Sequence, residues 1–232
     1  EQNLPLEEEL FPELLQEAGY NTAFLGKWHL NDPAGEEVFW PEKQGFDVNV
    51  AGHFRGGLYI KNKFFSPWDI PNLENGPEGE YMTDRLADEA VQFIDAQEDD
   101  PFLVYLSFYS VHAPFDAPED RVEKFAKKKE TLGLTDEDRF ATATDGDKTF
   151  KYRKEQDHAT YAAMVESVDM AVGKVLDKIK ADNKEGNTVV IFFSDNGGLS
   201  TSPVKNTPVD IWWNGSEKSP YFSLSSLMNK PT

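Results

Sequence analysis

"PFLVYLSF", residues 101–108, is the stretch that decides the expected fold. From Phe102 to Phe108 the side chains are almost continuously apolar, which is typical of a strand buried on both faces in a parallel sheet covered by helices. Two other β-rich apolar runs, at residues 22–26 and 188–193, predict two further strands.

Amphipathic helices are predicted around these strands. The spacing of apolar residues places helices at 6–18, at 83–97 behind a Thr83 cap, and at 161–179. Gly19 suits the end of the first helix, because glycine readily adopts the left-handed conformation found there. Helices that alternate with apolar strands indicate an α/β layered fold with a mainly parallel sheet.

Two long stretches lack this periodicity. Residues 31–81 are rich in Gly, Pro and aromatic residues and are much longer than an ordinary connection, so we expect them to line or cover a site. Residues 126–156 are highly charged and predict a surface excursion.

Composition excludes several classes of function. The chain has 232 residues, enough for one sizeable core, and its formal net charge of -19 disfavours nucleic acid and anionic membranes as partners. It has no cysteine, which excludes disulfides and thiolate metal sites, and no apolar run long enough to span a membrane. The first ten residues, "EQNLPLEEEL", do not form a signal peptide, and because the chain lacks an initiator Met this is consistent with truncation.

Polar clusters directly follow the three predicted strands. Lys27 and His29 follow the first, His112 follows the second, and Asp195 and Asn196 follow the third. Ligands of open α/β sheets bind outside the carboxyl ends of the strands, so we expect these side chains to share one site.

The residue types in these clusters suit an oxyanion. Lys27 offers a compact cation, and His29 and His112 exchange protons near neutral pH. Asp195 and Asn196 offer hard oxygen ligands, which suit Ca²⁺ or Mg²⁺. A divalent ion and a lysine can neutralise a sulfate or phosphate group while a histidine protonates the departing oxygen.

Each cluster also has an ordinary structural interpretation. Asp-Asn-Gly-Gly is a common turn after a strand, and a histidine shortly before a proline, as in "VHAP", is often a simple loop residue. Trp28 is interpreted as a packing residue rather than a chemical one.

"AGYNTAFLGKWHLN", residues 18–31, resembles a signature of the sulfatase family, from which it departs at Asn31, where the family usually has glycine. The resemblance continues through "FDVNVAG", "FLVYLSFYSVHAPF" and "FFSDNGGLSTS", covers about residues 6–202, and is strongest to bacterial arylsulfatase-A-like enzymes. It implies an alkaline-phosphatase-like α/β/α sandwich with a mainly parallel central sheet, incomplete at the N-terminus. The implied reaction is hydrolysis of a sulfate ester to an alcohol and inorganic sulfate.

The resemblance also implies roles for individual residues. Lys27 would contact the sulfate and the nucleophile, and His29 would hydrogen-bond the nucleophile and assist release of sulfate. His112 would donate a proton to the leaving alcohol oxygen. Asp195 and Asn196 would supply two calcium ligands, with Mg²⁺ as the alternative metal.

His53, in "VAGHFRGG", is a candidate substrate-binding residue by the same resemblance, and Arg55 is a weaker one. The family's nucleophile is a formylglycine made within Cys/Ser-x-Pro-x-Arg, and this chain contains no such motif. We expect that motif, with the aspartates that complete the metal site, to lie before residue 1. The fragment alone is therefore expected to be inactive.

The C-terminal end departs from the family as well. Residues 1–202 are expected to form a partial catalytic domain, and residues 203–232 a divergent or truncated tail without the family's Gly-Lys-Gly segment. Lys218, and less so Lys205, are candidates for the sulfate-contacting lysine of that segment.

The expected substrate is a sulfated small molecule or polysaccharide, with no nucleic acid or membrane partner. Two alternatives stay open from the residues: a phosphomonoesterase or phosphodiesterase of the same superfamily, and a non-catalytic protein that binds sulfated glycans. The family resemblance suggests a periplasmic or secreted protein.

Overall fold

The computed structural model describes residues 3–32, 37–59, 64–134, 140–145, 148–155, 157–195 and 197. The chain divides into two compact units. The first consists of Glu1–Lys128 with His158–Thr188, and the second of Lys129–Asp157 with Val189–Thr232. The first unit contains a parallel sheet and the second contains a β-hairpin.

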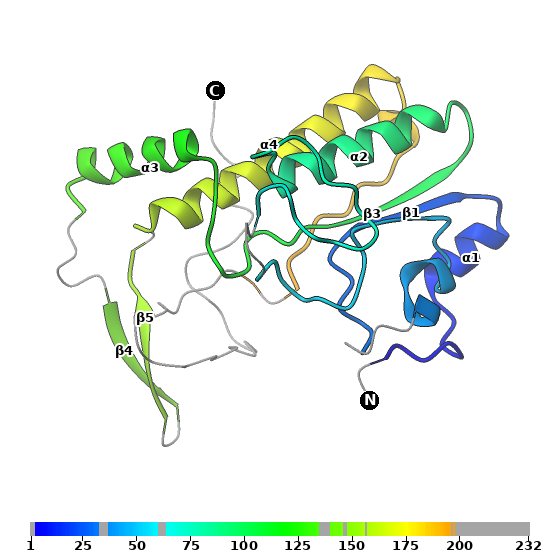
Figure 1. Cartoon of the computed structure of the whole chain (residues 1–232). Coiled ribbons are helices and arrows are strands. Elements are labelled where there is room, and N and C mark those ends of the chain that lie inside the picture. Colours follow the sequence, from blue (N-terminus) through cyan, green and yellow to red (C-terminus); the bar gives the residue numbers. More distant parts are fainter. Residues whose placement is uncertain are drawn as a thin grey trace. The chain divides into compact units, whose positions relative to one another are not determined.

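The sheet of the first unit has three parallel strands in the order β2-β1-β3 (Figure 1). They are β1 (Asn21–Gly26), β2 (Val48–Val50) and β3 (Phe102–Ser107). Both β1 and β3 were predicted from their apolar runs, whereas β2 is a short strand inside the long loop that follows β1. The sheet is therefore parallel, as expected.

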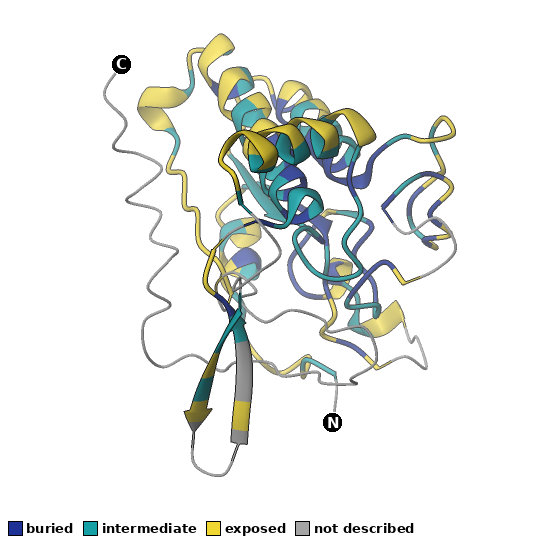
Figure 2. Ribbon diagram, turned by 90° about the vertical axis from the view of Figure 1, so that its left-hand side faces the viewer, coloured by how far each residue is buried: buried dark blue, intermediate teal, exposed yellow. Residues whose placement is uncertain are grey.

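Helices alternate with the strands of the parallel sheet along the chain. The α-helices are α1 (Phe11–Glu17), α2 (Met82–Ala96), α3 (Glu119–Thr131) and α4 (Ala159–Ala181), and the short 3₁₀ helices are η1 (Glu37–Phe39), η2 (Pro41–Lys43) and η3 (Glu185–Asn187). Helices α2 and α4 lie side by side, with exposed outer sides and buried or half-buried inner sides (Figures 1 and 2).

Side chains of β1 point alternately into two apolar clusters. Ala23 and Leu25 pack into the larger one, together with Leu86 of α2 and Met164 of α4. This alternation is the period of a β-strand, and the buried residues on both sides confirm the predicted α/β class.

The opposite face of β1 carries Phe24, which packs with Trp28 and Phe46. The ring of Tyr105 on β3 stacks on Phe24, with 5.3 Å between centroids, and lies 6.4 Å from the ring of Phe11 on α1. Helix α1 therefore covers this face, so that the sheet has helices on both sides.

Two predicted helix starts are corrected by the structure. The first helix begins at Phe11 rather than at residue 6, because Pro12 is tolerated only in the first turn, and the carboxylate of Glu13 accepts from Leu10 N–H at 2.7 Å. Helix α2 begins at Met82, and Thr83 does not cap it: its hydroxyl lies 2.7 Å from that of Ser110 instead.

The charged excursion predicted at 126–156 contains regular structure. It holds the end of α3 and an antiparallel hairpin of β4 (Phe140–Asp145) and β5 (Lys148–Arg153). Arg153 and Asp157 are both buried and form an ion pair, and Lys129 Nζ lies 3.3 Å from the same carboxylate.

The strand predicted at residues 188–193 is not formed. The side chains of residues 189–193 are exposed, with Val189 at 87% and Phe193 at 67% exposure, and no strand pairs with this run among the residues the structure describes. An apolar run has strand propensity, but a strand exists only where a neighbour accepts its backbone hydrogen bonds.

Within the described segments, no helix combines the length and the apolar character needed to cross a lipid bilayer.

Candidate active site

The adjacent strands β1 and β3 end at the same edge of the sheet, and the first candidate residues follow β1 there. Gly26 at the end of β1 lies opposite Ser107 at the end of β3, and Lys27 N–H donates to Ser107 C=O at 2.8 Å. Gly26 has φ +108°, and a Cβ atom there would lie 1.9 Å from that carbonyl oxygen, so only glycine fits. Lys27 and His29 therefore leave the sheet at its carboxyl edge, as predicted.

His29 occupies a strained position in the turn after β1. Its φ of +58° is left-handed, which is uncommon for a residue with a Cβ, and its N–H donates to His53 C=O at 3.0 Å. Burial, then the charge of Lys27, then that of His112 lower the pKa of His29 below its ordinary value. The imidazole is therefore neutral at pH 7 and within electrostatic range of both predicted partners.

His112 follows β3, and its hydrogen bonds indicate which ring nitrogen carries a hydrogen. Its Nδ1 lies 2.6 Å from the carbonyl oxygen of Ala113 and 3.3 Å from the hydroxyl of Tyr59. Because a carbonyl oxygen only accepts hydrogen bonds, Nδ1 carries a hydrogen, and the tyrosine oxygen can accept from it as well. The other ring nitrogen, Nε2, is then the atom through which His112 would exchange a proton with a ligand.

His53 is fully buried, with 0% of its surface exposed. Its Nδ1 accepts from the N–H of Arg55 at 3.0 Å, and its Nε2 lies 3.5 Å from the hydroxyl of Tyr109. Burial, and next the charge of Arg55, lower the pKa of His53 to about 4. His53 is thus a buried side chain, and its contact with a substrate stays a prediction.

The guanidinium of Arg55 is also engaged within the protein. Its Nη1 donates to Asp69 C=O at 3.0 Å, and its Cζ lies 5.5 Å from the centre of the Phe54 ring. These contacts fix the loop rather than present the guanidinium to a ligand.

Trp28 packs as interpreted from the sequence. Its ring meets Phe24 edge to face at 5.1 Å, and its Nε1–H donates to Phe39 C=O at 3.0 Å. Asn31, where the sulfatase signature has glycine, is buried, and its Oδ1 lacks a hydrogen-bond partner within the described part of the chain.

The predicted metal ligands are only partly described. Asp195 is exposed and belongs to the second unit, while Asn196, Lys205 and Lys218 lie outside the described residues. No group of three or more His, Asp or Glu side chains that could hold a metal ion occurs among the residues the structure describes. The calcium site stays a prediction.

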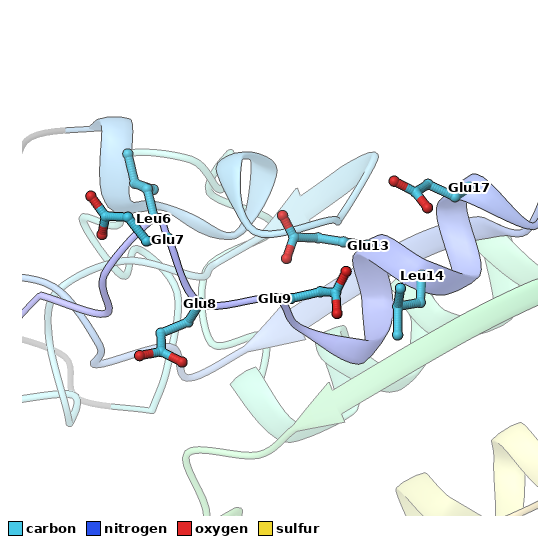
Figure 3. A pocket seen from close by; sticks show the side chains of 7 residues that line it. All are labelled: Leu6, Glu7, Glu8, Glu9, Glu13, Leu14 and Glu17. Carbon is cyan, nitrogen blue, oxygen red and sulfur yellow. The ribbon is translucent and has the colours of Figure 1, made fainter.

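A pocket elsewhere in the first unit is not a candidate for an oxyanion. It is lined by side chains around the start of α1, shown in Figure 3, namely Leu6, Glu7, Glu8, Glu9, Glu13, Leu14 and Glu17. Its carboxylates would repel a sulfate or phosphate group.

Sequence reasoning missed Tyr59, Tyr109 and Gly56. A Cβ atom on Gly56 would lie 2.3 Å from Nδ1 of His29, so the imidazole of His29 rests directly on this glycine. The paired glycines of "HFRGG" are the only sign of this contact in the sequence.

A pH-dependent loss of stability is expected from His53. Its pKa is about 4 in the folded protein and 6.5 in the unfolded reference, so the unfolded state binds more protons in between, and stability decreases as the pH falls from about 6.5 to about 4. The loss is on the order of 3 kcal/mol. Urea unfolding at pH 7 and pH 4.5 measures it against a His53→Asn variant, which has no such group. Equal acid sensitivity of the two proteins would contradict the buried neutral imidazole.

Comparisons with known proteins identify relatives of this chain. The chain is 29% identical to the sulfatase YdeN of Escherichia coli, over 97% of this chain and 42% of that protein. It is 27% identical to an ulvan-active sulfatase of Formosa agariphila, over 94% of this chain and 41% of the relative. The crystal structure of Ps i-CgsB with k-i-k-neocarrahexaose matches 78% of this chain and 38% of its own, with a TM-score of 0.55 and 27% identity.

The chain thus spans less than half the length of these relatives. The family model described as Sulfatase matches residues 1–232, which shows that the chain belongs to the sulfatase family.

Proposed function

We propose that this chain forms part of the catalytic domain of an enzyme that hydrolyses sulfate esters. The observation that supports the proposal is that β1 and β3 are adjacent and parallel, with Lys27 N–H bonded to Ser107 C=O, so that Lys27 and His29 leave the sheet at the same edge as the segment that leads to His112. A cation beside a neutral imidazole and a second proton-exchanging imidazole suits a sulfate group and its leaving oxygen.

Each of these residues has a defined task in the proposed reaction. The Lys27 ammonium neutralises negative charge on the sulfate, most strongly as charge develops in the transition state. The neutral His29 accepts or donates a hydrogen bond at the nucleophile and assists release of sulfate. His112, with a hydrogen on Nδ1, gives a proton from Nε2 to the leaving alcohol oxygen.

The proposed enzyme also uses a metal and a formylglycine. The carboxylate and amide oxygens of Asp195 and Asn196 fit a hard cation such as Ca²⁺, with Mg²⁺ as the alternative, but they supply two of the roughly six to eight ligands that calcium needs. When bound, the ion would neutralise sulfate oxygens. The formylglycine nucleophile is proposed to lie outside this chain.

A sulfated glycan is the proposed substrate class. Two relatives support it by name, one as an ulvan-active sulfatase and one as a complex with neocarrahexaose. In this chain the ring of Tyr59 is 63% exposed and lies 6.0 Å from that of His112, edge to face, which would place an aromatic surface beside the leaving alcohol.

The proposal is tested by comparing turnover of nitrophenyl sulfate and nitrophenyl phosphate by the full-length protein that carries this chain. Preferential release of sulfate supports a sulfatase. Faster phosphate release would identify a phosphoesterase of the same fold, and absence of both would leave a binding protein.

Substitution of His112 is expected to lower the rate for substrates with poor leaving groups far more than for substrates with good ones. In a His112→Ala variant, kcat/KM for a sugar sulfate should fall by a factor on the order of a hundred or more, because the alkoxide needs a proton, while nitrophenyl sulfate should lose much less. Steady-state rates per folded molecule measure the ratio. An equal loss on both substrates would rule out proton donation.

A further inference from the structure

His53 contributes a fixed pattern of hydrogen bonds although it is fully buried. Arg55 N–H donates to its Nδ1 at 3.0 Å, so the hydrogen of the neutral ring is on Nε2. The hydroxyl of Tyr109 donates to Ala51 C=O at 2.8 Å, which leaves the tyrosine oxygen to accept from Nε2–H at 3.5 Å. Both ring nitrogens are therefore partnered by a single, uncharged tautomer.

These bonds hold the turn at residues 51–56 in one conformation. The imidazole joins Arg55 at one end of the turn, and through Tyr109 it joins Ala51 at the other. Ala51 has φ +64°, a conformation that needs support from its surroundings in a residue with a Cβ. Tyr109 is itself 2% exposed and lies two residues after the end of β3, so the turn is tied to the sheet.

The same turn holds His29 at two points. The carbonyl oxygen of His53 accepts from His29 N–H at 3.0 Å, which fixes the backbone of the left-handed residue. The ring of His29 rests on Gly56, where a Cβ would lie 2.3 Å from both Nδ1 and Cε1. A shift of this turn would therefore move both the backbone and the ring of His29.

We propose that His53 is a positioning residue for His29 and acts through the turn at residues 51–56. In this proposal, Gly56 provides the space in which the His29 imidazole packs. This rests on the proposed function, in which His29 works at the nucleophile. Displacing such a group by about 1 Å lowers rates on the order of a hundredfold.

Three variants separate positioning from general stability. His53→Leu fills the space but offers Arg55 N–H no acceptor, whereas His53→Asn keeps an acceptor near the position of Nδ1. Gly56→Ala displaces the His29 ring and leaves His53 intact. Gly173→Ala, inside α4 with no atom within 4 Å of the added Cβ, is the control for a glycine substitution away from the site.

The measurements are kcat and KM for nitrophenyl sulfate in the full-length protein, and the imidazole NMR signals of His29 in the same proteins. We expect His53→Leu and Gly56→Ala to lower kcat about 10- to 100-fold with KM nearly unchanged, and to shift the His29 signals, while His53→Asn restores most of both. Gly173→Ala should leave both at their wild-type values.

The kinetic constants and the His29 NMR signals distinguish a failure of this proposal from a failure of the proposed function. Shifted His29 signals in a protein that does not turn over sulfate esters would support the positioning role and refute the sulfatase assignment. Wild-type His29 signals in folded Gly56→Ala and His53→Leu proteins would overturn the positioning role. If His53→Leu does not fold, a His53→Ala protein, which also offers Arg55 N–H no acceptor, is measured in its place with the same two outcomes.

Discussion

Replacing Lys27 with alanine is expected to lower kcat for sulfate ester hydrolysis by a factor on the order of a hundred or more in the full-length protein. Loss of one preorganised electrostatic partner has an effect of this size. In a chain with a formal net charge of -19, the ammonium at the end of β1 provides a local positive charge for an anionic substrate. Its removal should also raise the pKa of His29 toward the ordinary value, because the charge of Lys27 helps to lower it.

The measurement is the rate per folded molecule, with the folded fraction taken from circular dichroism. Lys43→Ala is a suitable control, because Lys43 is an exposed lysine in η2 and is not one of the candidate site residues. Equal specific activities of wild type and Lys27→Ala would show that "GKWHL" is only a packed turn.

The largest effect on stability is expected at Gly26. In a Gly26→Ala variant the new Cβ would lie 1.9 Å from Ser107 C=O and 3.2 Å from Leu86 Cδ1, and φ +108° is strained for alanine. The strands β1 and β3 would have to separate at their carboxyl ends, so we expect a loss of about 3 kcal/mol or more.

Thermal and urea unfolding measure this loss. Gly173→Ala tests the opposite case, because alanine replaces glycine inside a helix with open space around it, and a gain of about 1 kcal/mol is expected. A Gly26→Ala protein as stable as wild type would contradict the close approach of the two strands.

The sequence predicted those parts of the fold whose pattern is local. The apolar runs of β1 and β3 and the periodic faces of α2 and α4 are such patterns, and the structure confirms them. Strand β2 has three residues and no alternation, so its position depends on pairing with β1 rather than on its own side chains. The apolar run at 188–193 is the opposite case. Its residues have a strong propensity for β-strands, but it forms no strand because no neighbouring strand pairs with it among the described residues.

The position of the candidate site residues at the sheet edge was predictable to the extent that it depends on strand order. Lys27 and His29 follow β1, and His112 follows β3, at one edge of the sheet, because β1 and β3 are adjacent and parallel. The burial of His53 and the contact of Gly56 with His29 depend on the path of a loop through space. No spacing of residues in the sequence encodes that path.

The left-handed backbone of His29 has a consequence for laboratory evolution of this protein. At φ +58°, glycine and asparagine have a lower conformational energy than histidine. The variants His29→Gly and His29→Asn should therefore reduce backbone strain while removing the imidazole. A library screened only for heat resistance would then enrich variants that melt at a higher temperature and have lost turnover. Thermal stability and catalytic activity would then favour different residues at position 29. A screen that measures stability alone would select against the histidine.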